Sequence, residues 1–217
     1  LSVCLSGNNV YVVGGHAGFG NGTDGGNQQM FEDIALARVL PHLTVVVPAD
    51  YEQAKKMALA MADFSGPVYM RMTKPKRAVV TTMGTPLTIG KAQILRSGKE
   101  ATVFACGAMV YEALLAAEEL AGEIDVEVIN VHTIKPLDKE TILGSARKTK
   151  RVVTAEEHSI IGGLGGAIAE LLSEEYPAPM KRVGMGDKFG ETGEPDELLV
   201  KYGMTKEAII GKIRELL

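Results

Sequence analysis

A short apolar stretch joins a glycine-rich one near the start of the chain: Asn9-Val10-Tyr11-Val12-Val13-Gly14-Gly15-His16-Ala17-Gly18. Residues 9–13 are typical of a buried strand, and the two glycines at 14 and 15 end it. Residues 29–40 then have the spacing of an amphipathic helix. Strand, glycine-rich loop and helix in this order predict an α/β fold with a mostly parallel sheet, where ligands bind beyond the carboxyl ends of the strands.

The same alternation continues and divides the chain into two segments. Residues 1–75 contain expected strands at 9–13, 43–47 and 67–72 and expected helices at 29–40 and 50–63, the second capped by Asp50. Three strands leave both sheet edges open, so this segment resembles part of a domain. Residues 76–87 lack periodicity and predict a linker, and residues 88–217 are long enough for a complete α/β domain. The expected elements there are strands at 92–95, 102–105, 126–130, 151–156 and 181–185 and helices at 109–121, 139–148, 163–174, 196–201 and 205–217.

Composition excludes several classes of protein. The 217 residues are 46% hydrophobic with a net charge of −4, which excludes a disordered chain and gives no reason to expect nucleic acid or a membrane surface as partner. No apolar run approaches the roughly 20 residues of a membrane span. Cys4 and Cys106 are too few for a disulfide framework or a zinc site, so we expect buried thiols in a reducing, cytoplasmic compartment. Because residue 1 is Leu, we expect the chain to lack its native N-terminus.

The loop over residues 14–29 is the richest candidate site. It has seven glycines and presents His16, Asp24 and amides such as Gln28, groups suited to binding hydroxyls and a phosphate. The alternative is a flexible surface loop, although long loops without periodicity are usually functional or disordered. Arg71, near the end of the third expected strand, could bind an anion at the same edge or form an interior ion pair.

For several other groups of residues, a functional and a structural interpretation both stay open. The turn over residues 162–166 precedes a helix and could bind a phosphate, but tight packing is favoured because no dinucleotide or P-loop motif is present. Glu156, Glu157 and His158 could perform acid–base work, or they form a solvated strand end or subunit contact. His132 is a weak site candidate or a structural histidine, and His42 is typical of a turn.

Taken together, these stretches resemble the transketolase family of thiamine-diphosphate enzymes over essentially the whole chain. Several blocks carry the resemblance in one order: His16-Ala17-Gly18, Thr23-Asp24-Gly25, Gln29 with Phe31-Glu32-Asp33-Ile34-Ala35, Val47-Pro48-Ala49-Asp50, Gly66-Pro67-Val68-Tyr69-Met70-Arg71, His132-Thr133-Ile134-Lys135-Pro136-Leu137-Asp138, residues 156–166 and residues 187–195. The best match is the C-terminal subunit of a split transketolase. The resemblance implies that residues 1–75 are the latter part of a pyrimidine-binding domain and residues 88–217 the transketolase C-terminal domain.

The resemblance also implies roles for single residues. The positions of His16 and Asp24 line the sugar channel in transketolases, where Asp24 would bind a ketose hydroxyl and His16 with Arg71 would hold the sugar phosphate. Gln28 stands where the family has a histidine, and an amide cannot exchange a proton near neutral pH. The usual pentose-phosphate substrates are therefore in question, while transfer of a two-carbon ketol unit between sugar phosphates is still expected.

Cofactor and partners follow from the same resemblance. The family's catalytic glutamate would lie upstream of Leu1, so we expect no catalytic residue in this chain, and the ligands of Mg²⁺ and the diphosphate would belong to an N-terminal partner subunit. Self-association through both domains would give two copies of each subunit. The alternatives are a deoxyxylulose-phosphate synthase-like subunit, a 2-oxoacid dehydrogenase β-like subunit, and a non-catalytic dimerisation or regulatory module.

Overall fold

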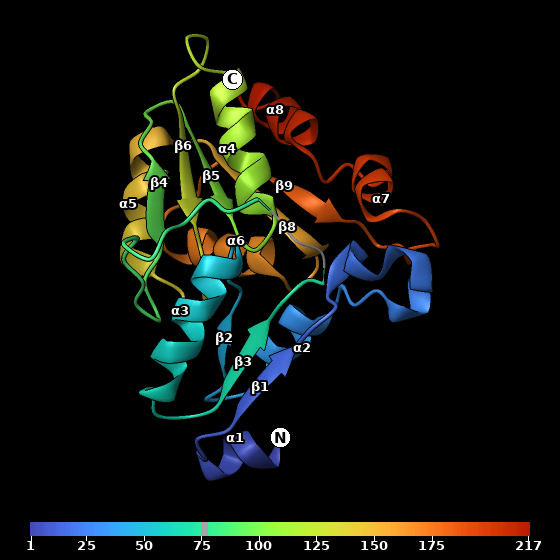
Figure 1. Cartoon of the computed structure of the whole chain (residues 1–217). Coiled ribbons are helices and arrows are strands. Elements are labelled where there is room, and N and C mark those ends of the chain that lie inside the picture. The colour runs from blue at the N-terminus through green and yellow to red at the C-terminus, as the bar shows by residue number, and fades with distance from the viewer. Residues whose placement is uncertain (75–77) are drawn as a thin grey trace.

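Two β-sheets, one built mainly from each half of the chain, lie one above the other in the computed structural model, which describes residues 1–74 and 78–217 (Figure 1). The expected α/β architecture is confirmed. Residues 76 and 77 of the expected linker lie outside the described residues.

The first sheet contains the three strands expected from the sequence. Strand β3 (Val68–Arg71) lies between β1 (Tyr11–Gly14) and β2 (Thr44–Val46) and pairs in parallel with both. The loop after β1 forms two short 3₁₀ turns, η1 (Gly18–Asp24) and η2 (Gly26–Gln28). The other elements of this half are α1 (Ser2–Ser6), α2 (Asp33–Arg38) and α3 (Tyr51–Ala62). Helix α2 is shorter than the expected 29–40 because Gln29 is extended and Met30 pairs with Ala17 in an isolated parallel bridge, where its carbonyl accepts a hydrogen bond from the N–H of Gly18.

A fourth strand, β7 (Thr133–Lys135), comes from the second half of the chain and pairs antiparallel with β2. The expectation that both sheet edges are open is therefore wrong at β2. Three residues are too few to show a two-residue alternation, which is why the sequence did not reveal β7. At the opposite edge, Val12 and Val13 of β1 are 50% and 54% exposed.

The second half of the chain contains β4 (Gln93–Arg96), β5 (Ala101–Ala105), α4 (Met109–Glu119), β6 (Val126–Asn130), α5 (Lys139–Thr149), β8 (Val152–Ser159), α6 (Leu164–Glu175), β9 (Met180–Met185), α7 (Pro195–Lys201) and α8 (Lys206–Arg214). Its sheet has the strand order β4-β6-β5-β8-β9, with only β4 antiparallel to its neighbour. Helices α4 and α8 cover one face, and α5 and α6 cover the other (Figure 1). The expected strands and helices of this half are all present.

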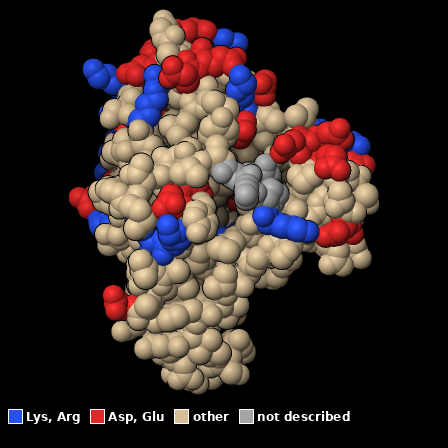
Figure 2. All heavy atoms as spheres, in the orientation of Figure 1, with Lys and Arg blue, Asp and Glu red and all other residues tan. Residues whose placement is uncertain are grey.

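One apolar cluster runs through both halves. It joins Cys4, Ile34 and Val45 of the first half to Phe104 and Ile129 of the second. Cys106 belongs to the same cluster, and both cysteines are free and buried, as expected. No helix in the described residues is long and apolar enough to cross a membrane. Figure 2 shows most charged side chains over the second half and few over the lobe formed by the first.

Asp50 connects α3 to the segment that leads into the second half. Its Oδ1 accepts hydrogen bonds from the backbone N–H of Gln53 and the hydroxyl of Thr81, both at 2.8 Å. Its Oδ2 accepts from the N–H groups of Val80 and Thr81, both at 2.7 Å. The carboxylate, 7% exposed, therefore serves both as the helix cap expected from the sequence and as an anchor for the crossing segment.

We expect Asp50→Ala to lower the free energy of unfolding by about 3 kcal/mol, because it removes a helix cap and leaves buried N–H groups unsatisfied. Urea denaturation at pH 7 followed by circular dichroism would measure this. The control is Asp63→Ala, which removes an exposed carboxylate at the other end of α3 and should change stability by less than about 0.5 kcal/mol. Equal urea midpoints for the two variants would contradict the anchoring role.

Candidate functional site

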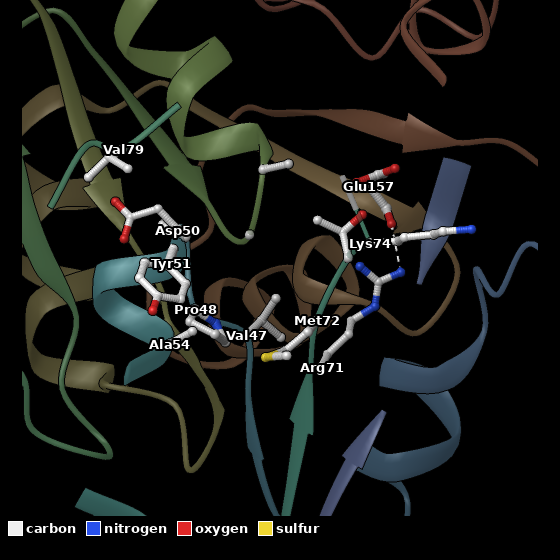
Figure 3. Close-up of a pocket in the computed structure, with 14 residues that line it drawn as sticks. Val47, Pro48, Asp50, Tyr51, Ala54, Arg71, Met72, Lys74, Val79 and Glu157 are labelled. Atoms are coloured by element: carbon white, nitrogen blue, oxygen red, sulfur yellow. Dashed lines mark hydrogen bonds between the residues drawn. The ribbon is translucent and has the colours of Figure 1, made fainter. Parts of the chain in front are cut away.

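The carboxyl ends of strands from both sheets meet at a cavity of about 440 Å³. Residues 47–50 after β2 and residues 71–74 at the end of β3 form one side. Gly107 after β5 and Glu157 of β8 belong to the other. Figure 3 shows Arg71 and Glu157 facing each other at one end of the cavity and Asp50 and Tyr51 at the other. This is the edge at which the parallel strands predicted a ligand site.

Three of the predicted site residues lie exposed on the loop that follows β1. They are His16, Asp24 and Gln28. The Asn21 side-chain amide donates to the carbonyls of His16 at 3.2 Å and Gln28 at 3.1 Å, so it holds the two ends of the loop together. Asp24 Oδ2 lies 3.8 Å from the Nζ of Lys74, which follows β3 and also lines the cavity.

Arg71, the fourth predicted residue, lines the cavity but is only 5% exposed. Its Nε donates to both carboxylate oxygens of Asp33 at 2.9 Å, and its Nη2 donates to the carbonyls of Met30 at 3.1 Å and Glu157 at 2.8 Å. Burial lowers the pKa of Arg71, but the Asp33 and Glu157 carboxylates outweigh that effect and raise it. Arg71 thus forms an interior ion pair, and its binding of a phosphate stays a prediction.

Glu157 supports the glycine-rich loop from the second half of the chain. Its Oε1 accepts a hydrogen bond from the backbone N–H of Phe19 at 2.8 Å. Gly18 has a φ of +65°, and a Cβ placed on it would lie 2.5 Å from the same oxygen. Glycine is therefore required at residue 18 by its backbone conformation and by the carboxylate beside it.

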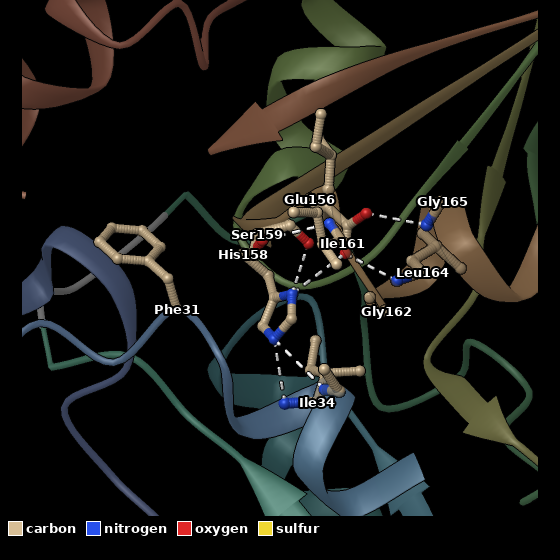
Figure 4. A network of polar contacts seen from close by, with 12 residues as sticks. Phe31, Ile34, Glu156, His158, Ser159, Ile161, Gly162, Leu164 and Gly165 are labelled. Atoms are coloured by element: carbon tan, nitrogen blue, oxygen red, sulfur yellow. Dashed lines mark hydrogen bonds and ion pairs between the residues drawn. The ribbon is translucent and has the colours of Figure 1, made fainter. Parts of the chain in front are cut away.

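Glu156 occupies the helix end that the sequence offered as a possible phosphate site. Its two oxygens accept hydrogen bonds from the N–H groups of Leu164 at 2.7 Å and Gly165 at 2.8 Å, at the start of α6 (Figure 4). Burial raises the pKa of Glu156 to about 7, opposed by these N–H groups. A nucleotide phosphate at this turn would have to displace a built-in carboxylate, so the structure favours the tight-packing interpretation.

His158, on β8 of the second half, caps the N-terminus of helix α2 in the first half. Its Nε2 accepts hydrogen bonds from the N–H groups of Ile34 at 3.1 Å and Ala35 at 3.4 Å, while its Nδ1 lies 2.7 Å from the Ser159 carbonyl (Figure 4). An accepting Nε2 requires the proton on Nδ1 and hence a neutral ring. Burial, with Arg71 nearby, lowers the pKa of His158 to about 4. His158 is fully buried within the chain, so a solvated strand end is the wrong interpretation here.

The remaining candidates have structural surroundings. His132 is buried beside the Thr133 hydroxyl, and burial lowers the pKa of His132 to about 4. His42 lies exposed in a turn with a φ of +64°. Within residues 1–74 and 78–217, no group of three or more His, Cys, Asp or Glu side chains is placed to hold a metal ion. Sequence reasoning missed Asn21 and Lys74, because nothing in the local pattern distinguishes a loop-bridging amide or a lysine at a cavity from other surface residues.

The surroundings of His158 predict a pH dependence of stability. The ring must be neutral in the folded chain, so the unfolded chain binds more protons between pH 6.5 and about 4. The stabilising effect of the neutral ring is therefore complete near pH 7 and is lost as the pH falls through this range. His132 acts in the same direction, whereas Glu156, with its raised pKa, acts in the opposite one.

We expect the stability advantage of the wild type over His158→Gln, which cannot be protonated, to shrink by on the order of 3 kcal/mol between pH 7 and pH 4. Urea denaturation at a series of pH values would measure the difference, in which the contribution of the distant His132 cancels. His42→Asn, in the exposed turn, is the control and should show no such slope. A constant difference between wild type and His158→Gln would contradict the prediction.

Comparison with known proteins identifies relatives of the whole chain. It is 45% identical over 217 residues to the 6-deoxy-6-sulfo-D-fructose transketolase subunit SqwH of Clostridium sp. (strain MSTE9), covering 100% of this chain and 67% of that protein. It is 34% identical over 216 residues to the transketolase of Rattus norvegicus, covering 98% of this chain and 34% of that protein. A solved structure described as a split gene transketolase, inactive β4 tetramer, matches with a TM-score of 0.93 and 42% identity over 100% of this chain and 69% of that one.

Two family models match successive parts of the chain. The transketolase pyrimidine-binding domain matches residues 2–78, and the transketolase C-terminal domain matches residues 90–209. The chain spans about two thirds of the SqwH relative and about one third of the rat enzyme. With the second model alone covering more than half of its residues, this chain belongs to the transketolase family.

Proposed function

We propose that this chain is the C-terminal subunit of a split transketolase and transfers a two-carbon ketol unit between sugar phosphates together with an N-terminal partner subunit in the cytoplasm. The observation that carries the proposal is the placement of His16, Asp24 and Gln28. All three are exposed on one loop at the carboxyl edge of the first sheet, in a chain of the transketolase family.

Each side chain has a role in the proposal. Asp24 accepts a hydrogen bond from a ketose hydroxyl near C2, and Gln28 binds a further hydroxyl through its amide. His16 and Arg71 hold the sugar phosphate. Lys74 adds a second cation that is more exposed, with 52% of its side chain accessible against 5% for Arg71. Its ammonium lies 3.8 Å from Asp24 beside the cavity, whereas Arg71 donates to Asp33 and two carbonyls.

The cofactor would be held mainly by the partner. Thiamine diphosphate with Mg²⁺ supplies the carbanion chemistry when bound. Within the part of the chain that the structure describes, no group of three or more His, Cys, Asp or Glu side chains is placed to hold the cation, which supports placing the Mg²⁺ ligands on the partner. In the proposal this chain binds and orients the sugar. Association with the partner and with a second copy would also cover exposed Val12 and Val13 at the open edge of β1.

The experiment is reconstitution of the chain with its partner subunit, thiamine diphosphate, Mg²⁺, a ketose donor and an aldose acceptor. We expect Asp24→Ala to lower kcat/KM for the donor about 10- to 100-fold, since a hydrogen bond to a charged group is lost, and to change donor preference more than His16→Ala does. Glu140→Gln, at an exposed carboxylate on α5, is the control and should leave activity unchanged.

Donor choice and side reactions separate the alternatives. Fructose 6-phosphate should be compared with 6-deoxy-6-sulfo-D-fructose, the sugar for which the SqwH relative is named. If the enzyme used only the sulfonated sugar as donor, the proposed ketol transfer would stand, but the proposed sugar-phosphate substrate would be wrong. Pyruvate decarboxylation alone would favour a deoxyxylulose-phosphate synthase-like or 2-oxoacid dehydrogenase-like subunit. Unchanged activity in both the Asp24 and His16 variants would favour a non-catalytic module.

The amide at residue 28 predicts a distinct pH profile. We expect Gln28→His to add an inflection to kcat/KM between about pH 6 and 7, because histidine titrates there and glutamine does not. Steady-state rates of the reconstituted enzyme across pH 5 to 9 would measure it, with Gln28→Asn as the amide control. If Gln28→His and Gln28→Asn gave the same profile, residue 28 would not contact the reacting sugar.

A further inference from the structure

Gln29 follows the proposed sugar-binding residues directly, but its own side chain faces the second half of the chain. It is 6% exposed. Its Nε2 donates to the carbonyl of Glu191 at 2.8 Å and to that of Gly22 at 3.3 Å. The backbone N–H of Gly193 donates to the same Gly22 carbonyl at 3.0 Å. One amide thus ties η1 to the segment over residues 187–193, named here the clamp segment.

The backbones of the loop and the clamp segment lie too close for side chains between them. A Cβ placed on Gly22 would lie 2.3 Å from the carbonyl oxygen of Gly193, and one on Gly26 would lie 2.4 Å from that of Gly190. A Cβ on Gly190 would lie 1.9 Å from Oε1 of Gln29. Glycine on both sides therefore allows main chain to rest on main chain, with little room for the loop to shift.

Aromatic packing supports the same contact from within. Phe19 of η1 is fully buried, with its ring centroid 4.7 Å from that of Phe31 and 5.0 Å from that of Tyr202, which follows α7. The side chain of Leu198 on α7 lies beside both glycines, since a Cβ placed on Gly22 would be 3.1 Å from it and one on Gly193 3.0 Å from it. The part of the loop between His16 and Asp24 is thus seated on the second half of the chain by apolar contact as well as by hydrogen bonds.

We propose that the clamp segment positions the sugar-binding loop, with Gln29 as the positioning residue that sets where Asp24 and Gln28 lie. The proposal rests on the proposed function, in which these two residues bind the sugar. Asp24 ends η1 and Gln28 ends η2, so the hydrogen bonds and glycine contacts of the clamp segment fall on the two turns that carry them. Gln29 itself does not touch the sugar in this proposal; it acts through the loop.

Four variants test the clamp, and the single variant Gln29→Ala is the reference for the double variant. Gln29→Glu keeps the size of the side chain but turns an acceptor toward two carbonyl oxygens. Gly190→Ala places a methyl group where Oε1 of Gln29 lies, at a position whose backbone is not left-handed. Gln29→Ala with Gly190→Ala removes that clash, because the next neighbour of the new methyl group is Phe19 at 3.3 Å. Glu197→Gln, at an exposed position on α7, is the control.

Hydrogen–deuterium exchange of the chain alone gives a readout that does not depend on activity. In Gln29→Glu and Gly190→Ala, peptides covering residues 14–29 and 187–193 should exchange about tenfold faster, as expected when buried hydrogen bonds are lost. Gly190→Ala should add nothing further once residue 29 is Ala. Unchanged exchange in both single variants, or additive effects of Gln29→Ala and Gly190→Ala, would overturn the clamp.

Kinetics of the reconstituted enzyme separate positioning from general stability. We expect the donor KM to rise about tenfold in Gln29→Glu and Gly190→Ala while kcat changes less than about threefold, since a misplaced loop weakens sugar binding. A fall in kcat as large as the rise in the donor KM, or no change in either constant, would overturn the positioning role. If the wild type transferred no ketol unit, the proposed function would fail, and the exchange data would still decide whether the clamp exists.

Discussion

A buried ion pair between Asp33 and Arg71, both in the first half of the chain, lies where that half meets the second, and much of the site depends on it. Arg71 ends β3, Asp33 begins α2, and the Arg71 guanidinium also donates to the carbonyl of Glu157 on β8. Burying charges costs free energy unless the remaining donors and acceptors are satisfied, and here the Tyr69 hydroxyl donates a further hydrogen bond to Asp33 Oδ2 at 2.7 Å. Removing one partner would leave an unpaired charge between the sheets.

This arrangement divides the polar residues into two groups with different roles. Exposed His16, Asp24 and Gln28 are available to a ligand, whereas buried Glu157 and His158 hold the loop and helix between them. The buried group comes from the second half of the chain and the exposed group from the first. The transketolase C-terminal domain thus supports the loop that carries the candidate site through buried hydrogen bonds.

Sequence reasoning predicted the parts of the fold that local patterns encode. Apolar runs separated by breakers located the three parallel strands and the elements of the second half, and Asp50 was correctly expected at the start of α3. The placement of Glu156 at the α6 N-terminus was not predictable, because the N–H groups that it accepts from are set by the tertiary fold. The need for glycine at residue 26 was not predictable for the same reason. The carbonyl oxygen that leaves no room for a side chain there belongs to Gly190, far away in the sequence.

Strand β7 also bears on how such proteins can be recombined. Its three residues lie within the part of the chain that matches the C-terminal domain, yet they pair with β2 of the pyrimidine-binding domain. A crossover in the interval between the two family matches would separate β2 from its neighbour in the sheet. A chimaera joined in that interval would pair β2 of one parent with β7 of the other, so the surfaces that these two strands present to each other should be taken from the same parent.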